Sequence, residues 1–310
     1  MKKIFIFYII FILLIITNTF SQEIYIKLKI NNQIITNIDI DNEKKYLAFF
    51  NPDVKQIPED KMEILSTNSL VREKIKTEEV KKFFDIKKEY DFLKKIENNI
   101  LNQKKFKDKS ELKKYLISID LDYKTLMDKI KLESLWNQII YNKYKNNIKI
   151  DEKYLKQRIL IAYEKSDKKY EYNLSEIVIE KLSKDEIKKK YDDIKKSVKE
   201  VGFQNTANLF GISNSAKIGG KIGWIKESQL SEKILNSIKK TNIGSITEEI
   251  EVAAGYLILQ INDKREIQGN LEIKKELKNL IEFEKNRQLN LYSLLYYKRL
   301  KQNASINEYR

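Results

Sequence analysis

The feature that most constrains the fold is a cluster of glycines late in the chain. Gly219, Gly220 and Gly223 lie in the segment FGISNSAKIGGKIGW, residues 210–224, which separates a charged helical region from the later run AAGYLILQINDKR. Glycine adopts positive φ angles at little steric cost, so these glycines indicate tight turns between regular elements. The sequence therefore predicts a module in which a strand, helices, this loop and a second strand follow one another.

The residues around the glycine loop have the patterns of strands and helices. Residues 172–180, YNLSEIVIE, are typical of a strand, and residues 249–252 and 256–262 are typical of a hairpin across Ala253-Ala254-Gly255. Helices are expected over residues 185–201, 203–210 and 231–239. The module therefore mixes helices with a small sheet.

The chain before this module is mainly helical. Residues 24–30, IYIKLKI, alternate as a half-buried strand does, and a helix is expected to begin near Ile38 with Thr36 or Asn37 as its cap. Proline suits the first turn of a helix, so a second helix is expected from Pro58 towards Ile75. Further helices are expected over residues 77–101, 110–115, 121–144 and 153–166.

After the module, a long helix is expected over residues 271–301, and residues 304–309 alternate as a strand does. A helix rises about 1.5 Å per residue, so this one is too long to be buried on the small module alone. Its apolar spacing lapses between Glu284 and Gln288, which argues against a coiled coil.

The N-terminus predicts export. Lys2 and Lys3 precede an apolar run over residues 4–16, and Thr19-Phe20-Ser21 supplies residues of the kind that a signal peptidase reads. We expect cleavage near Ser21, before Gln22. The alternative is an uncleaved membrane anchor, although the run is shorter than the ~20 apolar residues that span a bilayer.

The composition excludes several kinds of chemistry. The chain has neither cysteine nor histidine, so disulfides, thiolate chemistry and histidine-based zinc or acid–base sites are not expected. Its 60 Lys and Arg against 45 Asp and Glu give a net charge of +15. These charges alternate in sign along the helices, which is typical of solvated faces and not of a nucleic-acid surface. We therefore expect no metal, no small-molecule cofactor and no nucleic-acid partner.

The order of Phe210, Ser215, the three loop glycines, Gly255 and Tyr256 resembles that of a parvulin-type (PpiC) peptidyl-prolyl isomerase domain. The Gly244-Ser245-Ile246-Thr247 turn is also similar to that family. The opening strand and helix, the LDYKT segment and the tail QNASINEY resemble the SurA family of periplasmic chaperones.

The resemblance implies an α+β chain with a mostly helical chaperone core and an inserted FKBP-like domain, an antiparallel sheet with helices. It implies a signal peptide at residues 1–21, an N-terminal helical domain at 22–168 and a parvulin-like domain at 170–266. Residues 267–310 would form the C-terminal helix and a strand that pack back on the N-terminal domain. SurA chaperones have two parvulin domains, whereas this chain has room for one.

The positions of the family's polar catalytic cluster are all replaced in this chain. Active members have a His on the first strand, an Asp or Cys in the loop, a hydroxyl before the last strand and a second His on that strand. By resemblance these positions are Glu176, Ser213, Ala254 and Leu257. The family's apolar, substrate-binding pocket is conserved in type, at Ile222, Leu230 and Ile234.

Loss of preorganised polar groups costs orders of magnitude in rate. The resemblance therefore implies a periplasmic chaperone for unfolded outer-membrane proteins, with weak or absent isomerase activity and no confident catalytic residue. Active isomerisation, driven by desolvation of the amide in the apolar pocket, is one alternative. A membrane-anchored foldase is the other; the membrane would then be reached only through an uncleaved signal segment.

Overall fold

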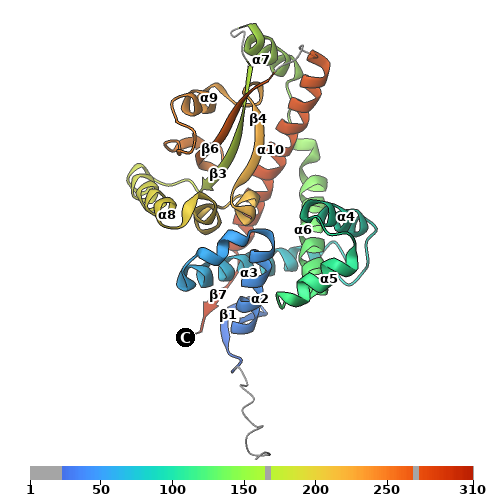
Figure 1. Cartoon of the computed structure of the whole chain (residues 1–310). Coiled ribbons are helices and arrows are strands. Elements are labelled where there is room, and N and C mark those ends of the chain that lie inside the picture. The colour runs from blue at the N-terminus through green and yellow to red at the C-terminus, as the bar shows by residue number, and fades with distance from the viewer. Residues whose placement is uncertain (1–22, 165–168, 268–271, 310) are drawn as a thin grey trace, which may run out of the picture.

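The computed structural model describes residues 23–164, 169–267 and 272–309, so the predicted signal peptide lies outside the described residues. The predicted α+β class is confirmed. Figure 1 shows a small sheet flanked by helices, a separate group of helices below it, and one long helix that runs alongside both. Across the described residues no helix has both the length and the apolar character needed to cross a membrane.

The N-terminal part consists of a short hairpin followed by helices. Thr36 begins the first helix with a capping box, because its hydroxyl accepts from the Asp39 backbone N–H while the Asp39 carboxylate accepts from the Thr36 backbone N–H. This confirms the predicted cap. The elements are β1 (Ile26–Ile30), β2 (Gln33–Thr36), α2 (Asn37–Phe50), η1 (Pro52–Gln56), α3 (Glu59–Lys81), α4 (Phe92–Lys104), α5 (Lys109–Ser118), α6 (Tyr123–Tyr144), η2 (Lys145–Asn147) and α7 (Glu152–Glu164).

The helix predicted over residues 77–101 is wrong. The chain leaves α3 at Lys81 and enters α4 only at Phe92. In the intervening turn the Asp85 carboxylate accepts a hydrogen bond from the Lys87 backbone N–H, and Tyr90 donates to the Asp85 carbonyl. Such local bonds offer the backbone an alternative to helix.

The C-terminal strand β7 (Ile306–Glu308) returns to the start of the chain. It pairs antiparallel with β1, with Lys29 opposite Asn307, and forms a sheet of order β2-β1-β7. The Tyr309 backbone N–H also donates to the Lys27 carbonyl over 2.8 Å. The tail is therefore a strand beside the first one, as the sequence predicts.

The second sheet has the order β4-β3-β6-β5, with every neighbouring pair antiparallel. Helix α8 changes direction at Gly202, whose φ of 82° lies outside the helical range, so the two helices predicted there meet at this residue. The elements are β3 (Lys169–Ile179), α8 (Lys184–Phe210), η3 (Asn214–Ile218), β4 (Lys221–Lys226), η4 (Glu227–Gln229), α9 (Glu232–Lys239), β5 (Ile250–Val252) and β6 (Gly255–Ile267).

Gly220 allows the glycine loop to lie directly against strand β3. Its φ is 73°, and a Cβ there would lie 2.2 Å from the Glu176 carbonyl oxygen. The Gly220 carbonyl accepts from the Glu176 backbone N–H over 2.7 Å. A side chain at position 220 would separate the loop from β3, so this glycine fixes where the loop meets the sheet.

Helix α10 (Ile273–Gln302) connects the two parts of the molecule. These are the helical part, which comprises β1 to α6 with β7, and the part built on the four-stranded sheet, which comprises β3 to β6. Near its start, Phe283 packs against the core of the four-stranded sheet. Further along, Ser293 accepts a hydrogen bond of 2.9 Å from the Trp136 indole on α6, and Tyr292 stacks on Tyr144 with ring centroids 4.6 Å apart. One helix therefore contacts both the sheet and the helical part (Figure 1).

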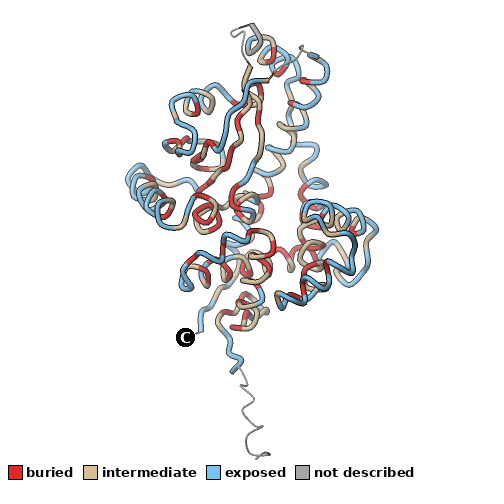
Figure 2. The backbone as a smooth tube through the Cα atoms, viewed as in Figure 1, coloured by how far each residue is buried: buried red, intermediate tan, exposed pale blue. Residues whose placement is uncertain are grey.

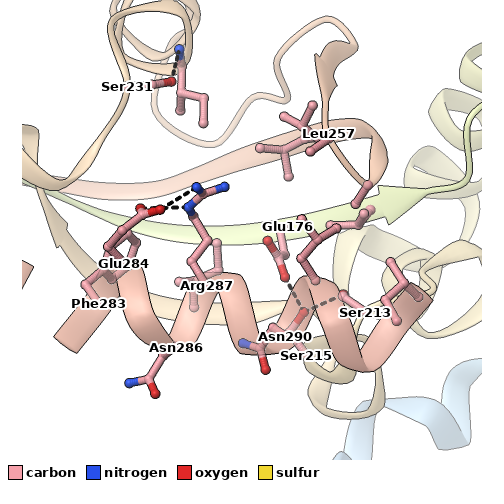
Figure 3. A pocket seen from close by; sticks show the side chains of 18 of the residues that line it. Glu176, Ser213, Ser215, Ser231, Leu257, Phe283, Glu284, Asn286, Arg287 and Asn290 are labelled. Carbon is pink, nitrogen blue, oxygen red and sulfur yellow. Dashed lines mark hydrogen bonds and ion pairs between the residues drawn. The ribbon is translucent and has the colours of Figure 1, made fainter. Parts of the chain in front are cut away.

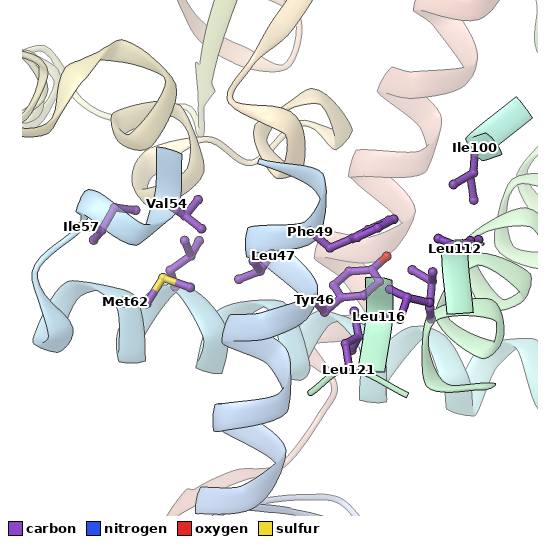
Figure 4. Packing of buried hydrophobic residues seen from close by; sticks show 12 residues of the cluster. Tyr46, Leu47, Phe49, Val54, Ile57, Met62, Ile100, Leu112, Leu116 and Leu121 are labelled. Atoms are coloured by element: carbon purple, nitrogen blue, oxygen red, sulfur yellow. The ribbon is translucent and has the colours of Figure 1, made fainter. Parts of the chain in front are cut away.

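The buried residues form several separate clusters (Figure 2). The largest lies within the helical part, where Tyr46, Phe49 and Met62 pack with residues of α4, α5 and α6 (Figure 4). Two further clusters cover the two faces of the four-stranded sheet, one of them facing α9 and α10 and the other facing α8. Each part therefore has a hydrophobic core of its own.

Candidate functional site

A cavity of about 750 Å³ lies between the four-stranded sheet and helix α10. The structure brings all seven site positions predicted from the sequence to this one cavity. These positions are Glu176, Ser213, Ile222, Leu230, Ile234, Ala254 and Leu257. They come from strands β3, β4 and β6, the loop before η3, the link between η4 and α9, helix α9 itself and the β5–β6 turn.

The sheet side of the cavity is mostly apolar. Leu230 and Leu257 are buried and belong to the core of the sheet, with Ile234 and Ala254 packed against them. Ile222 also lines the cavity and remains 37% exposed. This wall can therefore accept an apolar side chain or a proline ring from another molecule.

Three side chains form a polar chain at one end of that wall (Figure 3). The Ser215 hydroxyl donates to the Glu176 Oε1 over 2.6 Å, and the Ser213 and Ser215 hydroxyl oxygens lie 2.7 Å apart. Burial raises the pKa of the Glu176 carboxyl, against the hydrogen bonds from Ser215 and Ser213. Two of the replaced catalytic positions are thus joined through Ser215, whose role the family pattern did not indicate.

The opposite wall comes from α10. Phe283, Arg287, Asn290, Leu294 and Tyr297 recur at helical spacing and line the cavity. This wall was missed at the sequence level, although the lapse in apolar spacing between Glu284 and Gln288 lies at the same place. The lapse is explained by the cavity, because polar side chains there face a hollow and not a core.

Glu284 and Arg287 form an ion pair on the α10 wall (Figure 3). The Arg287 guanidinium donates to both carboxylate oxygens, over 2.8 and 2.5 Å. Burial alone would raise the pKa of Glu284, but the hydrogen bonds from Arg287 and Gln288 outweigh it and lower that pKa. Asn286 and Arg287 both line the cavity.

The helical part also contacts the η3 loop, through Lys217. Glu133 on α6 accepts from Lys217 of η3 over 2.5 Å and from Lys76 of α3 over 2.7 Å. Burial opposes ionisation of Glu133, but the two ammonium groups outweigh it and hold the pKa of Glu133 well below its usual range. Burial lowers the pKa of Lys76 to about 8.

The arrangement suits the binding of a peptide segment. An apolar wall, a short polar chain and a helical wall with an ion pair face one another across the cavity, where an extended chain could lie. Within the three described stretches, no three acidic side chains gather as ligands for a metal ion.

Residues 157–265 match the PPIC-type PPIASE domain family. Two similar proteins are named Chaperone SurA. The one from Pseudomonas putida is 25% identical over 152 residues, which is 47% of this chain and 36% of the relative. The one from Pseudomonas syringae pv. tomato is 25% identical over 167 residues, 51% of this chain and 38% of the relative. The chain therefore spans well under half the length of these relatives.

Solved structures with a similar arrangement include a SurA-like chaperone from Campylobacter jejuni. It covers 92% of this chain and 99% of its own at 16% identity and a TM-score of 0.39. A second is a peptidylprolyl isomerase (PrsA) from Bacillus anthracis. The match covers 77% of this chain and 98% of that chain, at 19% identity and a TM-score of 0.33. At such scores the structures add no argument to the sequence matches. On those matches and the family match over residues 157–265, the chain is a SurA-like protein with one PpiC-type, or parvulin, domain.

Proposed function

We propose that this protein is an exported, periplasmic chaperone that binds segments of unfolded outer-membrane proteins in the cavity between the parvulin-type sheet and α10. The observation that carries the proposal is the exposure of Ile222 in a cavity whose other predicted positions are mostly apolar. Such clients alternate aromatic and polar residues, and can place an apolar side chain in the pocket and backbone groups beside its polar edge.

We also propose a division into a chaperone core, residues 22–168 and 267–310, and an inserted parvulin domain, residues 170–266. The pairing of β1 with β7 supports it, because the two ends of the core meet in one sheet. The ion pair from Lys217 to Glu133 then holds the inserted domain on the core.

The test of client binding uses a charge placed in the cavity. Ile222→Asp should weaken binding of an unfolded porin about tenfold or more, because a carboxylate would be desolvated beside an apolar client side chain. Binding is measured by fluorescence anisotropy and by suppression of porin aggregation. Ile243→Asp is the matched control, since Ile243 is 57% exposed in the same domain but does not line the cavity. Equal loss in both variants would refute the cavity as the client site.

Export is tested separately. The protein recovered from the periplasm should begin at Gln22 or a nearby residue. A full-length chain found only in the inner membrane would favour the membrane-anchored foldase.

Isomerase activity is the second candidate function, and the chain of Glu176, Ser215 and Ser213 favours it. A hydroxyl beside an apolar pocket can stabilise a twisted prolyl amide, whose rotation has a barrier of about 18–20 kcal/mol. A proline-isomerisation assay run beside the aggregation assay distinguishes the two. A pure holdase suppresses aggregation without accelerating isomerisation.

A further inference from the structure

Glu176, Ser215 and Ser213 are joined by two hydrogen bonds. The direction in which these bonds donate depends on whether Glu176 carries a proton. An ionised carboxylate can only accept, so Ser215 gives its single proton to Glu176 and must accept from Ser213. Ser213 then has no proton left for a ligand, and presents only lone pairs to the cavity. In this state the loop offers no hydroxyl donor to a bound prolyl amide.

A protonated Glu176 permits the opposite direction. The carboxyl proton can be donated to Ser215, Ser215 can donate to Ser213, and Ser213 is left with a proton that faces the cavity. The heavy atoms need not move, because the contacts of 2.6 and 2.7 Å serve both directions. One proton on Glu176 is thus converted into one donor at Ser213.

A donor at this place has a chemical use. Twisting the prolyl bond removes its partial double-bond character and returns a lone pair to the nitrogen. A hydrogen bond to that nitrogen is stronger in the twisted state than in the planar one, and only such differential binding accelerates the reaction. Acceptor lone pairs on Ser213 would have no such effect.

We propose that Ser213 is a catalytic donor to the prolyl nitrogen of a bound client, that Ser215 is the positioning residue, and that protonation of Glu176 turns the hydroxyl chain towards the cavity. This inference rests on the proposed client binding at the cavity. It gives the parvulin-type domain an isomerase activity that is weak while Glu176 is ionised and increases when it is protonated.

The surroundings of Glu176 favour titration of this group. Burial raises its pKa, and the partners that act against the increase are the two serines. The charged groups on the elements around the cavity are otherwise engaged: Lys76 with Glu133, Arg287 with Glu284, Arg158 with the Ser228 and Leu230 carbonyls, Arg72 over the Tyr297 ring, Glu251 with Lys181, and Asp151 with the Tyr154 backbone N–H. Lys149 is the remaining charged residue among those that line the cavity, and Lys217 of the neighbouring η3 pairs with Glu133.

The experiment measures the isomerisation rate of a Leu-Pro peptide by exchange NMR, with the full mature chain, between pH 5 and pH 8. The wild-type rate, corrected for peptide occupancy, should increase about tenfold as the pH falls through the raised pKa of Glu176, which corresponds to ~1.4 kcal/mol. Ser213→Ala should abolish the increase and leave peptide binding within twofold. Ser215→Ala and Glu176→Gln should each make the rate independent of pH.

Ser245→Ala is the matched control, because Ser245 is an exposed serine of the same domain outside the cavity. It should keep the wild-type pH profile. A flat wild-type rate with peptide still bound, or a Ser213→Ala profile like that of the wild type, would overturn the hydroxyl chain as a donor while leaving client binding intact. Absence of binding by both the peptide and an unfolded porin would instead refute the proposed function, and the donor with it.

Discussion

Glu133 and Glu176 both contact the η3 loop, one from the helical part and the other from the four-stranded sheet, and their pKa values shift in opposite directions. Glu133 faces η3 from the helical part and contacts the ammonium groups of Lys76 and Lys217, which lower its pKa. Glu176 faces the loop from strand β3 and contacts the hydroxyls of Ser215 and, through it, Ser213; burial raises its pKa. The first carboxylate is fixed in its charged form, and the second can gain a proton.

This difference in pKa suits Glu133 to positioning the loop and Glu176 to exchanging a proton. A carboxylate paired with two cations neutralises their charge and positions the loop, but is poorly suited to exchanging protons near neutral pH. A carboxylate held only by hydroxyls keeps its proton more readily and passes the change to its neighbours. The helical part would then position the loop, and the sheet would determine what the loop offers to a client.

The largest expected effect is the loss of unfolding free energy when Glu133 is replaced. Glu133→Ala leaves the ammonium of Lys76 buried without its partner, since that side chain is only 2% exposed. Loss of one member of a buried pair costs about 3–5 kcal/mol of unfolding free energy. Urea denaturation at pH 7 measures it.

Glu200→Ala is the control for this change. Glu200 on α8 pairs with Lys61 on α3, so it also links the two parts, but its side chain is 43% exposed. A surface pair contributes about 0–1 kcal/mol. If both variants lost the same stability, the Glu133 contacts would have no special role in holding the loop.

A smaller loss is expected from damage to the helical part far from the loop. Deleting the residues after Gln302 removes β7, the partner of β1, and exposes Leu28 and Ile30 beside the lost Ile306. We expect a loss of roughly 1–3 kcal/mol, by apolar area and lost hydrogen bonds. Thermal unfolding measures it.

Glu308→Ala keeps the backbone pairing of β7 and alters only an exposed side chain, so its stability should stay within about 0.5 kcal/mol of the wild type. Peptide binding at the cavity should survive the deletion at temperatures where the chain remains folded. Unchanged melting after the deletion would argue that β7 adds nothing to the first sheet.

Local signals predicted much of the fold. Thr36 caps α2 and Gly202 divides α8, each because short-range chemistry determines the outcome. The tail alternates as a strand does, but its pairing with β1 is a long-range contact that only the family resemblance implied. The break between Lys81 and Phe92 was missed because Ile86 and Tyr90, four residues apart, fit an apolar helical spacing. In the structure they pack instead against the cluster of α6 and α10, a contact that spacing alone cannot indicate.

Only part of the candidate site could be predicted from the sequence, because the rest depends on long-range packing. The seven positions followed from the family pattern, and all reach one cavity. The α10 wall did not follow, because it depends on how a distant helix packs. The family pattern, with its two histidine positions replaced by Glu176 and Leu257, gives Ser213 no catalytic partner. Ser215 supplies a different partner, so the hydroxyl chain predicts a loss at low pH.

Acid should lower the contribution that ionised Glu133 makes to the unfolding free energy. The pKa of Glu133 is lowered on folding, so its contribution to stability is fully present above the unfolded value of 4.5 and is lost as the pH falls below it through the lower, folded value. The unfolding free energy of the wild type should therefore fall below pH 4.5. Glu133→Gln should flatten this part of the curve, and a parallel decline in both proteins would contradict the assignment.

The smallest effect concerns Glu176. Its contribution to the unfolding free energy changes with pH in the opposite direction to that of Glu133. Burial raises the pKa of Glu176 on folding, so the folded chain holds this proton more tightly than the unfolded chain, and stability falls as the pH rises from 4.5 through the raised value. Glu176→Gln removes the ionisation and should make the protein slightly more stable than the wild type at pH 8, with the two curves converging towards pH 4.5. Urea titrations at pH 5 and pH 8 check this. If Glu176→Gln instead lost more stability at pH 8 than at pH 5, the ionised carboxylate would be a structural partner like Glu133, and the contrast between the two sides of the loop would fail.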